Sequence, residues 1–133
     1  MVPSLDRVCV VIARTRHRMV MAEVQEAARL GAKMLEIRLD YISKSLDLKR
    51  LLDKKPCPMV ATIRRREDGG RWTGTEEQRR VLLRQCIVGG FDWVDLEHDI
   101  ATIIPRFGSV KRIVSYHNLE GIPDDLEERY ERM

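Results

Sequence analysis

The sequence predicts an α/β fold built on a parallel sheet. Strand-like and helix-like segments alternate along the chain and together describe five βα units. This alternation implies parallel strands joined by right-handed crossovers, with the helices packed on the outside. A length of 133 residues fits one compact domain. The pattern leaves two architectures open: a doubly wound sheet and a (β/α)8 barrel.

Each predicted element follows from hydrophobic periodicity and from helix start and stop signals. The strands are runs rich in apolar and β-branched residues, whereas the helices carry apolar residues at helical spacing. Thr75 and Gln78 form a capping box at the start of the third helix, and Gly89 and Gly90 end that helix. The expected strands span residues 8–13, 33–39, 58–63, 92–96 and 112–116. The expected helices span residues 19–30, 46–52, 75–88 and 124–133, with a weak helix or turn over 100–107.

Composition narrows the range of functions. The formal net charge is only +3 and aromatic residues make up 5% of the chain, so no nucleic-acid partner is expected. No segment approaches the roughly 18 apolar residues of a membrane helix, and residues 1–6 show no signal-peptide pattern. We therefore expect a cytoplasmic protein with no membrane contact. The first βα turn, residues 14–18, contains no glycine, which disfavours a Rossmann phosphate loop. Cys9, Cys57 and Cys86 lack paired spacing and predict free, mostly buried thiols.

The second strand carries ionisable residues on one face. Glu36, Arg38 and Asp40 alternate with apolar residues, so all three face the same way. A strand inside a parallel sheet is normally apolar on both faces. Buried charges are tolerated when they pair with one another or with a bound molecule. This face therefore predicts a binding site, and the alternative is an edge strand with a solvated face.

Polar groups also end the next three strands. Thr62 and Arg64 end the third, Asp95 and Glu97 the fourth, and His117 stands at the exit of the fifth. Active sites of parallel α/β folds are built at the carboxyl ends of the strands. Arginine suits an anionic or polyhydroxylated substrate, and histidine suits proton transfer. These residues together predict a pocket for a small molecule.

Each residue taken alone also has a structural interpretation. His117 is compatible with a turn or capping role, and residues 64–66 with a solvated basic loop. A metal site needs several histidines or clustered carboxylates, and His17 and His98 have no such neighbours in the sequence. No metal is therefore expected.

Four segments resemble the type I 3-dehydroquinate dehydratases, the Schiff-base class of the shikimate pathway. Residues 36–40 resemble the family's E-x-R-x-D strand, and residues 95–97 its D-[LIVM]-E strand. Residues 62–64 with 68–70 resemble its arginine strand and acidic-Gly-Gly loop. Residues 115–118 resemble the S-x-H-[DN] segment that carries the catalytic histidine. The order and approximate spacing agree over most of the chain.

The resemblance implies a (β/α)8 barrel that dehydrates 3-dehydroquinate to 3-dehydroshikimate. In this family a lysine forms an imine with the substrate ketone, without a cofactor. His117 then corresponds to the general base at carbon and the general acid for the departing hydroxyl. Glu36, Arg38 and Arg64 match residues that hold the ring hydroxyls. Asp68 matches a supporting position near the histidine where the family commonly has Glu.

The imine lysine of the family lies on the strand after the histidine strand. This sequence ends at Met133, inside the preceding helix, and a complete barrel has about 250 residues. We therefore expect residues 1–133 to be a single incomplete (β/α) barrel domain, the N-terminal part of such an enzyme, inactive alone and without a Schiff-base lysine. Its open edges and apolar face predict a homo-oligomer, such as a dimer, or marginal stability. The chain's six lysines match other positions: Lys33, Lys44, Lys49, Lys54, Lys55 and Lys111.

Two functions from other classes remain open. One is a non-catalytic oligomerising half-barrel or assembly domain, which the absent lysine favours. The other is a phosphate-binding or nucleic-acid-binding half-barrel, which the basic run over residues 64–66 favours.

Overall fold

Five parallel strands form one sheet, in which each strand pairs with the next along the chain. The order is β1-β2-β3-β4-β5. The structure is a computed structural model and describes residues 6–133. Residues 1–5, most of the segment considered for a signal peptide, lie outside the described residues. The strands are β1 (Val10–Ile12), β2 (Leu35–Arg38), β3 (Met59–Thr62), β4 (Trp93–Glu97) and β5 (Lys111–Ser115).

The strand order decides between the two architectures. A doubly wound sheet reverses its order at a switch point, whereas these strands progress in one direction as in a (β/α)8 barrel. The fold is therefore part of a barrel sheet. Its five strands follow one another as expected, but within residues 6–133 only four are followed by an α-helix, because turns alone connect β4 to β5. β2 pairs with β1 on one side and β3 on the other, so the edge-strand interpretation of its charged face is wrong.

The helices lie close to their expected positions. The capping box of Thr75 and Gln78 is confirmed, and Gly90 follows α3 with a φ of 117°, a conformation that favours glycine. Residues 100–107 contain turns and no helix. No helix in residues 6–133 combines the length and hydropathy needed to cross a bilayer. The helices are α1 (His17–Arg29), α2 (Leu48–Leu52), α3 (Glu76–Gly89) and α4 (Leu126–Arg132), with 3-10 turns η1 (Leu39–Tyr41) and η2 (Arg66–Asp68).

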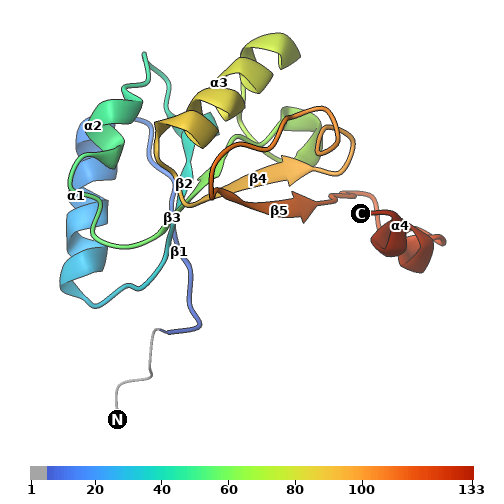
Figure 1. The fold of residues 1–133 in the computed structure, drawn as a ribbon, viewed down its shortest axis with the longest axis horizontal. Helices are drawn as coiled ribbons and strands as arrows, with labels where there is room; N and C mark the ends of the chain where they lie inside the picture. Colours follow the sequence, from blue (N-terminus) through green and yellow to red (C-terminus); the bar gives the residue numbers. More distant parts are fainter. Residues whose placement is uncertain (1–5) are drawn as a thin grey trace.

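One sheet face packs against α1, α2 and α3. The alternate residues of β2 on this face, Leu35 and Ile37, are buried, as are their partners in register on β3, Met59 and Ala61. The helices cover this side of the sheet in Figure 1 and add apolar side chains such as Leu83 to the same core. Burial of this face accounts for the helical periodicity of the sequence.

The opposite sheet face is less covered. Val11 and Ile113 on the two edge strands point to this inner face and are 51% and 37% exposed. α4 contains no buried residue and lies beyond the end of β5, apart from the other helices (Figure 1). The inner face therefore presents its polar side chains toward an open space.

Candidate active site

The strands β2 and β3 bring the first polar pair together on the inner face. Glu36 on β2 is half-buried, and Thr62 on β3 is buried. The Thr62 hydroxyl donates a 2.7 Å hydrogen bond to Glu36 Oε1. Arg38 pairs in register with Thr62, so it borders the same pair. The sequence prediction that these residues share one face is confirmed.

Arg64 is the centre of a buried charge cluster at the carboxyl ends of β3, β4 and β5. Its Nη1 donates to Glu97 Oε2 and to the Ser115 hydroxyl, and its Nη2 lies 2.9 Å from Asp95 Oδ1. The Ser115 hydroxyl donates a 2.6 Å hydrogen bond to the same Asp95 oxygen. Since Arg64, Asp95 and Glu97 are all buried, mutual pairing offsets the cost of removing their charges from water.

A second buried arginine joins this cluster from α3. The side chain of Arg79 is completely buried, and Nη1 donates 2.8 Å hydrogen bonds to Glu97 Oε1 and to the Ile63 carbonyl oxygen. Nε and Nη2 bind both oxygens of Glu76. Burial opposes the charge of Arg79, but the hydrogen bonds and the charges of Glu76 and Glu97 outweigh it and raise the pKa of this guanidinium.

The sequence analysis missed Arg79, although the sequence contains a signal for it. Arg79 lies at the spacing of the buried residues Leu83, Cys86 and Ile87, on the helix stripe that faces the core. A charge in such a stripe indicates a buried partner, because an unpaired buried cation is costly. That partner, Glu97, is 18 residues further along the chain.

Arg38 is held in place at the end of β2. Its Nε and Nη2 donate to the two carboxylate oxygens of Asp40, at 3.0 and 2.8 Å. These hydrogen bonds raise the pKa of Arg38. Its guanidinium also lies over the ring of Tyr41, 4.9 Å from the centroid. Asp40 belongs to η1 and not to the strand, so the expected strand over residues 33–39 ends one residue early and Asp40 orients Arg38 from a turn.

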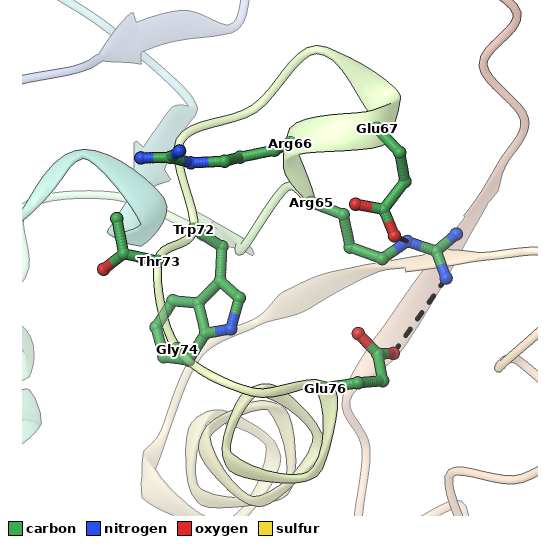
Figure 2. A pocket seen from close by; sticks show the side chains of 7 residues that line it. All are labelled: Arg65, Arg66, Glu67, Trp72, Thr73, Gly74 and Glu76. Carbon is green, nitrogen blue, oxygen red and sulfur yellow. Dashed lines mark ion pairs between the residues drawn. The ribbon is translucent and has the colours of Figure 1, made fainter.

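Asp68 lies in the loop that follows β3. Its Oδ2 accepts a 2.8 Å hydrogen bond from Arg65 Nε, while the same guanidinium binds both oxygens of Asp99 at 2.8 and 3.0 Å. The loop approaches the segment after β5, because a Cβ built at Gly69 would lie 3.5 Å from Leu119 Cδ2. Figure 2 shows that Arg65 lines a pocket beside this loop and that its guanidinium faces Glu76, the first residue of α3.

His117 lies two residues beyond the end of β5. It is half-buried, and its Nδ1 has no hydrogen-bond partner among residues 6–133. It follows Ser115 by two residues, and Ser115 is the residue of β5 that binds Arg64. The structure shows no hydrogen bond or ion pair between His117 and the other predicted site residues. The structure thus brings Glu36, Arg38 and Arg64 to the carboxyl edge of the sheet. Asp68 and His117 lie on segments next to this edge.

The lysines lie away from this edge. Lys33 and Lys55 precede β2 and β3, and Lys111 begins β5, so all three are at the amino ends of strands. Lys55 Nζ binds Asp92 at 2.6 Å, and Lys111 Nζ lies over the Trp93 ring. Lys49 and Lys54 belong to α2 and the turn after it, and Lys44 is exposed in the loop after η1.

No group of three or more histidine, cysteine, aspartate or glutamate side chains within residues 6–133 could hold a metal ion. The three cysteines are free thiols, as expected. The expectation that they are mostly buried is wrong, because Cys9 is exposed, Cys57 is intermediate and only Cys86 is buried.

Comparison with known proteins identifies relatives of this chain. Residues 8–133 match the family model for Type I 3-dehydroquinase. A bifunctional 3-dehydroquinate dehydratase/shikimate dehydrogenase of Arabidopsis thaliana is 36% identical over 137 residues, with 94% of this chain and 22% of that protein covered. A 3-dehydroquinate dehydratase of Methanopyrus kandleri is 40% identical over 107 residues, with 77% of this chain and 49% of that protein covered.

A solved structure has the same fold. The 3-dehydroquinate dehydratase of Geobacillus kaustophilus superposes with a TM-score of 0.71 at 26% identity, covering 93% of this chain and 56% of that one. The chain therefore spans about half the length of the monofunctional relatives described here, and less of the bifunctional one. The family match over residues 8–133, the one-directional parallel sheet and the charged strand ends agree, and the chain belongs to the type I 3-dehydroquinase family.

Proposed function

We propose that this chain supplies substrate-binding and proton-transfer residues for the dehydration of 3-dehydroquinate to 3-dehydroshikimate and water, a hydro-lyase reaction of the shikimate pathway. The observation that carries the proposal is the meeting of polar side chains from β2, β3, β4 and β5 at the carboxyl edge of one sheet face. Membership of a family whose named relatives are 3-dehydroquinate dehydratases supports it.

Glu36, Arg38 and Arg64 hold the ring hydroxyls of the substrate. Arg64 retains a donor for this task, because Nη1 and Nη2 bind its protein partners and Nε has no partner among residues 6–133. The buried carboxylates Asp95 and Glu97 fix the plane of the Arg64 guanidinium, which reduces the side-chain freedom lost on substrate binding.

His117 moves the protons. As a neutral imidazole it removes a proton from the carbon next to the imine, and it then returns that proton to the departing hydroxyl, which leaves as water. Its Nδ1 is buried and has no hydrogen-bond partner among residues 6–133. Asp68 plays a supporting role from the loop after β3.

The imine lysine is not among the six lysines of this chain. Three of these lysines begin or precede strands, two belong to α2 and its turn, and Lys44 is exposed. The 133-residue chain by itself therefore does not form the imine, and turnover requires residues that the relatives carry in their remaining half.

The test compares the 133-residue chain with the same chain joined to the C-terminal remainder of the Methanopyrus kandleri relative. Turnover is followed by the ultraviolet absorbance of the conjugated enone after addition of 3-dehydroquinate. We expect no signal from the short chain, and turnover from the joined chain that His117→Ala abolishes and His98→Ala retains. His98 is the matched control because it also follows a strand but packs edge-to-face against Tyr116.

Borohydride reduction in the presence of substrate tests the lysine separately. Mass spectrometry should show a covalent adduct on the joined chain and none on the short chain. Turnover or an adduct on the short chain would contradict the lysine assignment, and unchanged turnover in His117→Ala would contradict the role of the histidine.

A second candidate is a non-catalytic oligomerising half-barrel. It is favoured by the edge strands β1 and β5, by the exposed Val11 and Ile113 on these strands, and by α4, which contains no buried residue. Such a chain should form a dimer in size-exclusion chromatography coupled to light scattering. A monomer at micromolar concentration would oppose this candidate.

We also propose a cytoplasmic location. Free thiols such as those of Cys9, Cys57 and Cys86 persist in a reducing compartment. Fractionation of cells that express the protein natively checks this location, and recovery in a membrane or secreted fraction would contradict it.

A further inference from the structure

Arg66 differs from the two arginines that precede it. Arg64 is neutralised by Asp95 and Glu97, and Arg65 by Asp68 and Asp99. Arg66 makes no side-chain hydrogen bond or ion pair with any of residues 6–133 and is exposed. Figure 2 shows it extending away from Arg65 and Glu67. Two of the three arginines in the basic run are therefore paired with carboxylates, and within residues 6–133 Arg66 is the one arginine of the run without such a partner.

Arg71 is a second cation without an acidic side-chain partner in the described part of the chain. Its backbone N–H donates to Asp40 Oδ2, which fixes the start of its side chain. Its guanidinium lies over the ring of Tyr41, 4.3 Å from the centroid. Stacking of this kind restricts the motion of the guanidinium. Its N–H groups point outward in the plane of the guanidinium and remain able to donate hydrogen bonds.

Arg66 and Arg71 line the same pocket, which has a volume of about 720 Å³. Its walls come from the loops after β1, β2 and β3, which also place hydroxyl groups there: Thr15, Tyr41, Ser43 and Thr73. Among the described residues, Asp40 is the only acidic one in the wall; its side chain is inaccessible, and its two oxygens bind Arg38 and the Arg71 N–H. The accessible charge of the pocket is therefore positive.

We propose that this pocket binds a phosphate group, either inorganic phosphate or a phosphomonoester. Two free guanidinium forks match the oxygens of a dianion bidentately, and hydroxyl groups complete the donor set. The pocket is built from loops and not from the inner sheet face. It adjoins the residues proposed for 3-dehydroquinate, because Asp40 and Tyr41 in its wall both contact Arg38. Because a bound phosphate would join three loops, it stabilises the carboxyl edge of the sheet where those residues lie.

The test titrates the 133-residue chain with inorganic phosphate at ionic strength held constant with chloride. Amide chemical shifts by NMR and heat by calorimetry are the readouts. We expect saturable binding with shifts at Thr15, Ser43 and Thr73, and at least about a tenfold loss of affinity in Arg66→Ala and in Arg71→Ala. Arg84→Ala is the matched control, because Arg84 is exposed on α3 outside this pocket, and it should leave the affinity unchanged.

Three further arms decide what the pocket recognises. Glycerol phosphate should bind like inorganic phosphate, and acetate should bind more weakly because it carries a single charge. A short single-stranded oligonucleotide that binds more tightly than phosphate, with steep salt dependence, and that requires Arg66 and Arg71 would overturn the small-phosphate assignment in favour of a nucleic acid. Absence of saturation, or equal weakening by Arg84→Ala, would also overturn the proposal. None of these outcomes depends on dehydratase turnover.

Discussion

Replacement of Arg79 by methionine removes a buried cation while conserving most of the side-chain volume. Arg79 Nη1 binds Glu97 Oε1 and the Ile63 carbonyl, each at 2.8 Å, and Glu97 is only 2% exposed. Loss of one partner of a buried ion pair costs about 3–5 kcal/mol of folding free energy. Glu97 keeps Arg64 as a partner and the Glu76 side chain, 37% exposed, regains water, so we expect a loss near the lower end, about 3 kcal/mol.

Urea unfolding followed by far-ultraviolet circular dichroism measures this loss. The matched control is Arg84→Met on the same helix, where the side chain is exposed and a change within about 0.5 kcal/mol is expected. The double variant Arg79→Met with Glu97→Gln should be less destabilised than the sum of the two single variants, because it removes the buried carboxylate oxygen that loses its partner in Arg79→Met. A single variant as stable as the unaltered chain, or an equal loss in the control, would refute the buried network as a source of stability.

Two other perturbations test the loops around the site. Gly70→Ala should cost about 1–3 kcal/mol of folding free energy, because the added Cβ would lie 2.1 Å from the Arg64 carbonyl oxygen. Gly89→Ala at the end of α3, where the added Cβ would lie 3.6 Å from Leu52 Cδ1, should be neutral or stabilising by about 0.5–1 kcal/mol. Equal urea midpoints for the two variants would contradict this expectation. The hydrogen bonds from Arg79 lower the pKa of Glu76 below its ordinary 4.5, and those from Arg65 lower the pKa of Asp99 below 3.8. At these pH values the folded chain binds fewer protons than the unfolded chain, so this contribution to stability is present above about pH 4.5, the ordinary carboxyl pKa. It is lost as the pH falls through the lowered pKa values. Urea unfolding between about pH 6 and about pH 3 should show a fall in the free energy of unfolding, and a smaller fall in Glu76→Gln.

Local patterns predicted most of the secondary structure. The period of two on β2, the helical spacing on α1 and α3, and the capping box of Thr75 each depend on neighbours within a few residues, so they are readable along the chain. The register of Arg38 with Thr62 also follows from parallel strands whose polar residues end at the same edge. The role of Asp40 did not follow, because a 3-10 turn and not the strand positions it.

Partner choice among the charged side chains depended on tertiary packing. Arg64, Arg65 and Arg66 are adjacent in the sequence, yet the first is buried in a carboxylate cluster, the second binds Asp99, and the third pairs with none of residues 6–133. Glu97, a partner of Arg64, lies 33 residues away on β4, and Asp99, a partner of Arg65, lies 34 residues away in the turn after β4, whereas Asp68 follows Arg65 by three residues. The local pattern does not specify pairs separated by a whole βα unit.

The sequence by itself determined the parallel βα pattern, the identity of the polar strand ends and the resemblance that the family match confirms. Only the tertiary structure decided that the strands progress in one direction, that Arg79 enters the Glu97 cluster, and that Arg66 and Arg71 share a pocket. The physical reason is that backbone propensity and hydrophobic period act over one or two turns of chain. Strand order and charge pairing are instead set by which surfaces the whole chain can bury together.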